Sequence, residues 1–131
     1  MPIIYTDNPL PEVGQLIFKE YASENGSFQS ASLAFVDEAI LEGKPWMYTE
    51  VALMEDFGNE IRVYNGFESG GMPPKYTRIA TDEDITKFLR LIKDGKVTEG
   101  SKDFLSWLKD INSDQVLLAK EKERINRLSA L

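Results

Sequence analysis

The chain contains no cysteine and no histidine among its 131 residues. Without cysteine it has no disulfide, no thiolate nucleophile, no zinc ribbon and no iron–sulfur ligand of its own. Without histidine it lacks the commonest general base near neutral pH and the usual partner of a nucleophilic serine. Any chemistry would have to use carboxylates, lysines, tyrosines or hydroxyls. We therefore expect no cofactor and no metal, and we predict a protein that is not an enzyme.

Long apolar runs are also missing. No stretch approaches the roughly eighteen apolar residues that are needed to cross a bilayer, and residues 1–12 show no basic segment followed by an apolar one. We therefore expect a cytoplasmic protein with no membrane partner. The hydrophobic fraction of 42% and the charged fraction of 28% are close to those of soluble globular proteins, so we predict a single globular domain over residues 1–131.

Negative charge is concentrated in the first half of the chain. Residues 1–67 hold eleven acids and three bases, a balance of −8, whereas residues 68–131 hold eleven acids and twelve bases, a balance of +1. The two balances add up to the net charge of −7. An acidic surface of this kind can attract a basic partner, and it can equally serve only to keep the protein soluble.

Apolar spacing predicts two helices near the N-terminus, after a short strand at residues 2–6. Asn8-Pro9 is suited to the start of the first helix and Asn25-Gly26 to its end. Apolar residues recur at helical spacing in both segments: Val13, Leu16, Ile17 and Tyr21 in the first, and Leu33, Val36, Ile40 and Leu41 in the second. Gly43 then indicates the end of the second helix.

The clearest strand signal lies in residues 46–67. Two runs rich in β-branched and aromatic residues flank Gly58-Asn59, a dipeptide that suits a two-residue hairpin turn. With this turn, Glu55 faces Arg62 across the two strands and the two side chains form an opposite-charge pair. Apolar residues occur on both faces of this hairpin, so we expect it to be central in the sheet and covered on each side.

The second half of the chain is predicted to be mainly helical. Thr81–Asp84 has the pattern of a capping box, in which a hydroxyl and an acid three residues later satisfy the first backbone groups of a helix. Gly95 is suited to the end of that helix. Ser101 and Ser113 are suited to the start of two more helices, the last of which runs toward the C-terminus.

Taken together, these elements predict an α+β domain. Its sheet is small and mainly antiparallel, with a central hairpin (about 46–67) and a further strand at 75–80. N-terminal helices and a helical C-terminal half are expected to pack against this sheet.

Acid-rich stretches raise the possibility of catalysis or cation binding. Asp82-Glu83-Asp84 can ligate a hard cation, but acids in a first helical turn are expected from capping and from the helix dipole. Four acids of the hairpin could supply the carboxylate pair of a hydrolase: Glu50, Glu55, Asp56 and Glu60. The predicted pairing with Arg62 makes Glu55 a poor general acid. A carboxylate-based hydrolase is therefore the third of our functional interpretations.

The second interpretation is single-stranded nucleic-acid binding by an aromatic hairpin. Aromatic residues on or beside the predicted strands could stack on bases: Trp46, Tyr48, Tyr64, Phe67 and Tyr76. Arg62, Lys75 and Arg78 are close to them in the sequence and could contact phosphates. The net negative charge and the tendency of aromatic residues to fill a core weigh against this interpretation.

The leading hypothesis concerns residues 67–76, FESGGMPPKY, which are predicted to form a connection longer than a hairpin turn requires. Methionine, aromatic and stiff proline residues are useful at interfaces. The candidate partner-binding residues are Phe67, Met72, Pro73, Pro74 and Tyr76, together with Asp37, Glu38 and Glu42 of the predicted second helix. We predict a small acidic, non-enzymatic protein that binds a protein partner with a basic surface, as an inhibitor, adaptor or assembly subunit. The alternative is a crossover loop whose Phe67 and Met72 fold back onto the core.

Overall fold

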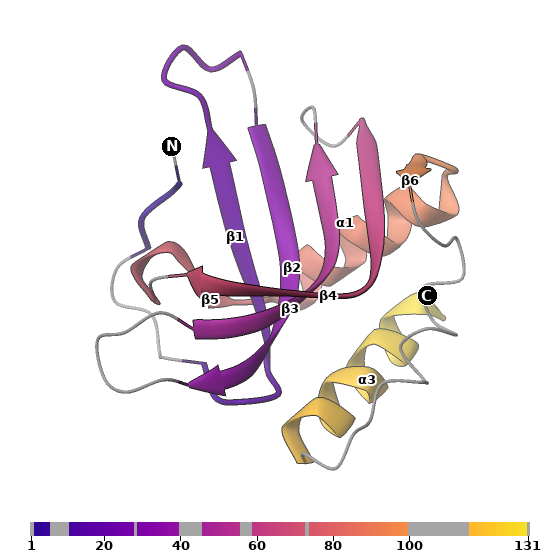
Figure 1. Ribbon diagram of the computed structural model, residues 1–131. Helices are drawn as coiled ribbons and strands as arrows, with labels where there is room; N and C mark the ends of the chain where they lie inside the picture. The colour runs from indigo at the N-terminus through magenta and orange to yellow at the C-terminus, as the bar shows by residue number, and fades with distance from the viewer. Residues whose placement is uncertain are drawn as a thin grey trace.

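A computed structural model describes residues 2–5, 11–27, 29–39, 46–55, 59–72, 74–99 and 116–130. These residues form a six-stranded sheet in the order β5-β1-β2-β3-β4-β6, with two α-helices (Figure 1). The strands are β1 (Leu16–Ala22), β2 (Gln29–Ala39), β3 (Trp46–Glu55), β4 (Glu60–Met72), β5 (Arg78–Ile79) and β6 (Val97–Glu99). The helices are α1 (Asp82–Lys93), α3 (Val116–Ser129) and the short 3-10 helix η2 (Pro74–Tyr76). Among the described strands, only β4 and β6 pair in parallel, so the predicted α+β class with a mainly antiparallel sheet is confirmed.

The prediction of two N-terminal helices is wrong, because the described parts of both segments are strands β1 and β2. Leu16 and Ile17 are adjacent and both fully buried, since they contribute to hydrophobic clusters on opposite faces of the sheet. A strand that is buried on both faces carries a continuous apolar run, and such a run also fits helical spacing. Asn25-Gly26, predicted to end a helix, instead lies in the connection between β1 and β2, where Gly26 has a φ of +70°.

The β3–β4 hairpin is confirmed, but its predicted register at the tip is wrong by two residues. Glu55 pairs with Glu60 instead of Arg62, and Gly58 of the predicted turn lies outside the described residues. A shift of two residues leaves each side chain on its predicted face. The predicted ion pair still forms, with 3.5 Å between Arg62 Nη2 and Glu55 Oε2.

Most of the predicted connection at residues 67–76 is also not a loop. β4 continues through Met72 and is followed by η2. Its last residues have backbone partners in β3, where Met47 pairs with Gly70 and Trp46 pairs with Met72. The strand predicted at 75–80 is correspondingly short and is limited to β5. The prediction failed because a glycine-rich strand end has the composition of a loop until its partner strand is known.

β3 and β4 bend sharply partway along their length (Figure 1). Partway along β3, at Val51, the pairing shifts register against both β2 and β4. Val51 and Ala52 are adjacent but both belong to the same hydrophobic cluster. An extra residue in one strand of a pair locally bends the sheet in this way and re-aims its side chains. The bend separates the hairpin tip from the opposite ends of the two strands.

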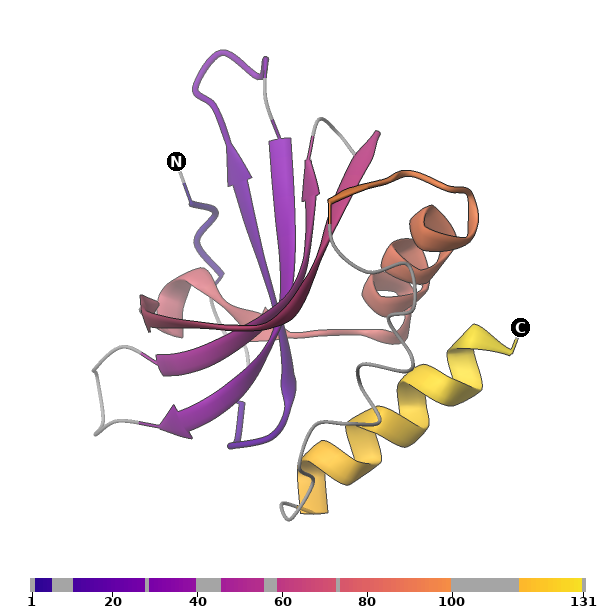
Figure 2. The ribbon, with the colours of Figure 1, turned by 45° about the vertical axis from the view of Figure 1, so that its right-hand side comes forward.

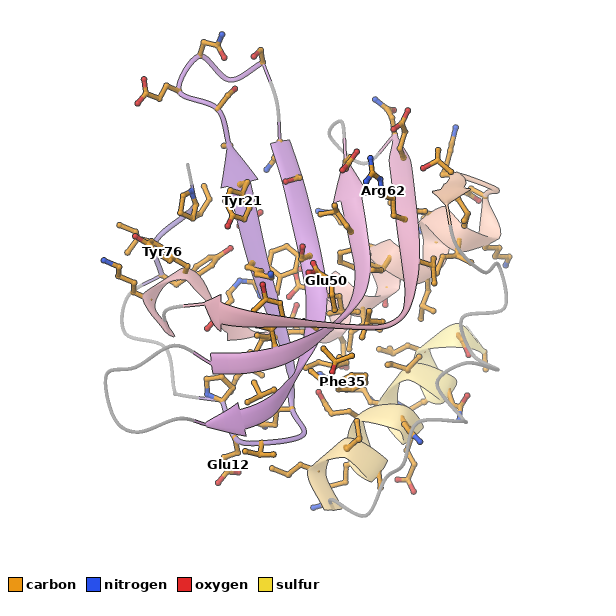
Figure 3. All side chains as sticks on the ribbon, viewed as in Figure 1. Glu12, Tyr21, Phe35, Glu50, Arg62 and Tyr76 are labelled. Atoms are coloured by element: carbon orange, nitrogen blue, oxygen red, sulfur yellow. The ribbon has the colours of Figure 1, made fainter. Side chains whose placement is uncertain are left out.

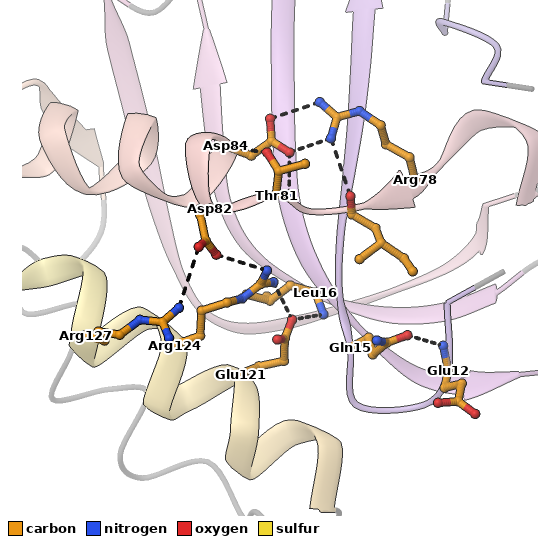
Figure 4. Close-up of polar contacts among 11 residues, drawn as sticks. Glu12, Gln15, Leu16, Arg78, Thr81, Asp82, Asp84, Glu121, Arg124 and Arg127 are labelled. Carbon is orange, nitrogen blue, oxygen red and sulfur yellow. Dashed lines mark hydrogen bonds and ion pairs between the residues drawn. The ribbon is translucent and has the colours of Figure 1, made fainter. Parts of the chain in front are cut away.

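Both α-helices lie on one face of the sheet, which we call the helix-covered face (Figure 2). Phe88 of α1 and Ile125 of α3 are fully buried there. Glu121 of α3 also fixes the start of β1, because its Oε2 accepts hydrogen bonds from Leu16 N and from Arg124 Nη2, both at 2.8 Å (Figure 4). The opposite face, which we call the second face, buries a smaller group: Ile17, Ala34, Val36 and Tyr48.

The predicted capping box of α1 is confirmed. Asp84 N donates to Thr81 Oγ1 at 3.2 Å, and Thr81 N donates to Asp84 Oδ2 at 2.8 Å. The last predicted helix is confirmed over its described residues as α3, whereas the helix predicted from Ser101 falls on residues 100–115, outside the described ones. In the described ranges, no helix is both long and apolar enough to cross a bilayer.

Candidate binding site

Three strand ends meet at one corner of the sheet. β2 ends, β3 begins and β4 ends there, since Ala39 pairs with Trp46 and Trp46 pairs with Met72. One step inward, Glu38 pairs with Met47, which in turn pairs with Gly70. We call this region, residues 37–39, 46–48 and 69–72, the distal corner.

The distal corner brings together candidate residues that are far apart in the sequence. Asp37 and Glu38 lie at the end of β2, two strands away from Met72. Phe67 lies farther along β4, where it pairs with Glu50. The side chains of these candidates, and that of Pro74, are not among the described ones, and Glu42 and Pro73 lie wholly outside the described residues.

Tyr76 is the candidate residue whose side chain the structure does describe. It is half-buried and packs against the second-face cluster that contains Val36 and Tyr48 (Figure 3). The neighbouring Lys75 Nζ lies 5.0 Å from the centroid of the Tyr76 ring, a distance at which a cation and an aromatic face attract each other. Tyr76 therefore joins η2 to the second face, and only part of its ring is open to a partner.

A buried charged pair on the second face was missed by the sequence analysis. Lys19 is only 4% exposed, and its Nζ lies 3.7 Å from Glu50 Oε2 and 3.9 Å from the centroid of the Tyr48 ring. Burial of a lysine is rare unless its charge is compensated, and here a carboxylate and an aromatic face compensate it. Because Lys19 belongs to β1 and Glu50 to β3, this contact joins two strands that lie on either side of β2.

The outer edge of β4 is largely unpaired within the described residues. β4 has 13 residues, but β6 pairs only with Ile61 and Arg62. From Val63 to Met72, β3 is the one strand that the described part of the chain places beside β4. Every second residue of such an edge turns its backbone N–H and C=O groups away from the sheet.

Two of the hairpin acids, Glu55 and Glu60, face each other near the hairpin tip, whereas Glu50 lies farther along β3. Glu50 is paired with Lys19, Glu55 is paired with Arg62, and Glu60 is exposed. Asp56 lies outside the described residues. Where the structure describes side chains, no group of three acids is placed to hold a metal ion.

Arg78 and Asp84, whose pKa values depart from the ordinary ones, belong to a cluster of polar contacts beside α1 (Figure 4). Two hydrogen bonds join Arg78 to the Asp84 carboxylate, at 2.5 and 2.9 Å, and they raise the pKa of Arg78. Burial alone would raise the pKa of Asp84, but the bonds from Arg78 and from the Thr81 backbone outweigh it and lower that pKa. The hydrogen bonds between Thr81 and Asp84 confirm the interpretation of Asp84 as a capping residue.

The same cluster extends to the N-terminal segment. Tyr5 Oη donates a hydrogen bond of 2.5 Å to Glu20 Oε2. Burial, followed by this hydrogen bond, raises the pKa of Tyr5, so its hydroxyl stays protonated across the physiological range. Glu20 is thereby held in place by a neutral donor.

The residues that were predicted to bind single-stranded nucleic acid have different environments in the structure. Tyr48 is 5% exposed beneath Lys19, so its ring faces are covered. Arg78 is held by Asp84 and stacks over the Phe18 ring at 4.2 Å. The side chains of Trp46, Tyr64 and Phe67 are not among the described ones. Nucleic-acid binding therefore stays a prediction, without the contribution of Tyr48.

Comparison with known protein families, curated proteins and solved structures found no match for this chain.

Proposed function

We propose that the chain is a small, non-enzymatic cytoplasmic protein that binds a protein partner at the outer edge of β4. The partner contributes an extended segment, which pairs with β4 as an added strand. A single observation carries the proposal: within the described residues, Val63–Met72 has a neighbouring strand on the β3 side only.

A long open edge favours strand addition for a physical reason. No other strand of the described part of the chain bonds to its outward N–H and C=O groups, and an extended peptide can satisfy them with a regular ladder of hydrogen bonds. β4 also contains Gly66, Gly70 and Gly71. Glycine has no side chain beyond its α-carbon, so a second backbone can approach β4 closely at these positions.

Charge favours a basic partner segment. Residues 63–74 contain one acid, Glu68, and no base. Asp37 and Glu38 lie at the distal corner, where β4 ends. A segment that carries lysine or arginine would meet complementary charge along this edge, which mainly improves the association rate and the choice of partner.

Amide hydrogen exchange of the free protein tests the first part of the proposal. The outward amides of residues 63–72 should exchange much faster than the inward amides of the same strand, which are bonded to β3. Native mass spectrometry on the same sample should show a monomer. Slow exchange along the whole edge in the monomer would contradict the proposal, and a dimer with protected edges would identify a second copy of the chain as the occupant instead.

Selection from a library of displayed 12-residue peptides tests the second part. We expect basic peptides with strand-forming residues to be enriched and to slow the exchange of amides 63–72 when they bind. The double change Asp37→Lys/Glu38→Lys should weaken this binding by about tenfold, because it reverses two charges at the distal corner.

The matched control is Glu24→Lys/Glu123→Lys, which makes the same change of net charge at exposed acids outside the distal corner. This control should bind the selected peptides nearly as the wild type does. Equal weakening in both variants would show that only net charge matters. Binders that protect a segment other than β4 would refute the assignment of the site.

A further inference from the structure

A cavity of about 200 Å³ opens on the helix-covered face, between the sheet and α1. Its apolar walls come from Phe18, Ala31 and Met54 of the sheet and from Leu91 of α1. The three sheet residues are buried. An apolar cavity of roughly 150 Å³ is enough to hold a benzene ring, so this one has room for a single ring or a short alkyl chain.

The rim of this cavity carries positive charge. Lys87 and Arg90, one turn apart on α1, line the cavity and are exposed. Among the described side chains, no carboxylate lies within ion-pair distance of either cation. Neither cation therefore has to leave a carboxylate of the described part of the chain in order to turn toward an anion.

One carboxylate also lines the cavity, and it already accepts a hydrogen bond. Glu20 lines the cavity and accepts the hydrogen bond from Tyr5. Two cations and one carboxylate leave the site with a balance of +1. Arginine and lysine bind carboxylates with charge-assisted hydrogen bonds, and the arginine fork can hold both oxygens at once.

We propose that this cavity binds a small carboxylate whose apolar body is about the size of one aromatic ring. The ring enters between Phe18, Met54 and Leu91, and the carboxylate stays at the rim with Lys87 and Arg90. This site is separate from the outer edge of β4, and the proposal does not depend on strand addition there.

Phenylacetate is a suitable probe, because it combines one ring with one carboxylate. In a two-dimensional NMR titration of the full chain, we expect saturable shifts of amides that line the cavity, with a dissociation constant on the order of 1 mM. Phenylacetamide has the same shape without the charge and should bind at least about tenfold more weakly. Phenethylamine, which carries a positive charge, should not bind.

Two variants connect the binding to the cavity. Lys87→Gln/Arg90→Gln should weaken phenylacetate binding by at least about tenfold, and because both side chains are exposed, folding should be preserved. Lys93→Gln/Lys96→Gln removes two exposed charges that do not line the cavity and should bind as the wild type does. Ala31→Leu should fill the cavity and abolish binding, with circular dichroism confirming that the variant is folded.

Three results would overturn the proposal. The first is an absence of saturable shifts at 20-fold excess over the expected dissociation constant. The second is equal binding of phenylacetate and phenylacetamide, which would show that the cations play no part. The third is equal weakening by the two glutamine variants, which would show a response to net charge instead of a site.

Discussion

The helix-covered face of the sheet packs hydrocarbon against hydrocarbon, whereas the second face places a lysine among its apolar side chains. On the helix-covered face, Phe88 and Ile125 are fully buried, and the Arg78–Asp84 pair lies at the margin with part of each side chain still exposed. On the second face, Lys19 is almost completely buried.

The helix-covered face mainly stabilises the fold, whereas the charged pair of the second face mainly holds strands in position. Apolar burial stabilises a fold in proportion to the area removed from water, so the larger cluster on the helix-covered face supplies most of the stability. A buried ion pair contributes little net stability, because the desolvation of both charges offsets their attraction. Lys19 and Glu50 instead join β1 to β3 across β2, and Glu50 in turn pairs with Phe67 of β4, the strand at which we propose binding.

The largest expected effect on the free energy of unfolding comes from shortening a buried isoleucine, and two isoleucines in strands allow the faces to be compared. Ile61 contributes to the helix-covered face and Ile17 to the second face, and both are fully buried. Ile61→Ala should lower the free energy of unfolding by about 4 kcal/mol, and Ile17→Ala by about 2 to 3 kcal/mol, since a smaller cluster relaxes more easily around a cavity. Urea denaturation followed by circular dichroism measures both values. A larger loss for Ile17→Ala would reverse the ranking of the two faces.

The next effect tests the lysine itself. Lys19→Met should lower the free energy of unfolding by about 3 kcal/mol, because Glu50 is left buried without its cation. The double change Lys19→Met/Glu50→Leu should restore most of that loss, since it replaces the pair with apolar groups of similar size. The same denaturation experiment provides the values. If the double variant were no more stable than Lys19→Met, the pair would be a main source of stability and the comparison of the faces would fail.

The third effect concerns the margin of the helix-covered face. Asp84→Ala removes the partner of Arg78 and half of the capping box, so we expect a loss of about 2 kcal/mol at neutral pH. Glu83→Ala is the control, because it removes an exposed acid from the same helical turn and should cost no more than about 0.5 kcal/mol.

The effect of Asp84 should also depend on pH in one direction. Folding lowers the pKa of Asp84 below its ordinary value of 3.8, so the folded state binds this proton less readily than the unfolded state does. The stabilisation is therefore complete above about pH 5 and is lost as the pH falls through the lowered pKa. Denaturation at a series of pH values should show the wild type and Asp84→Ala converging at acid pH. A constant difference down to pH 2 would contradict this assignment.

The two described α-helices were easier to predict than strands β1 and β2, because the signals of a helix start are local. The capping box at Thr81–Asp84 uses residues within one helical turn, and the sequence identified it correctly. β1 and β2 were mistaken for helices, because burial on both faces removes the alternation that marks a strand. Gly14, with a φ of +94°, and Gly26 lie on either side of β1. Two glycines so close together in the sequence favour a short strand between them over a long helix.

The candidate site could be predicted only in part. The sequence singled out Met72, Asp37 and Glu38, but it could not place Met72 and the two acids at one corner of the sheet, because strand order is a property of the whole chain. An open edge likewise depends on the absence of a neighbour and not on the residues of β4 itself. Lys19 carried a weak signal, since it is the one base within the apolar run of β1.

The smallest expected effect concerns the ion pair at the hairpin tip. This pair is partly exposed, whereas the Lys19–Glu50 pair is buried. Glu55 and Arg62 lie 3.5 Å apart, and 42% of the Arg62 side chain is exposed. Water and salt screen such a pair, so Arg62→Gln should change the free energy of unfolding by no more than about 0.5 kcal/mol. Repeating the denaturation in 0.5 M NaCl should reduce even this difference, while the loss caused by Lys19→Met should persist. A salt-insensitive loss above 1 kcal/mol for Arg62→Gln would show that exposure does not separate the two pairs, and that charge stabilises the hairpin tip as well as the second face.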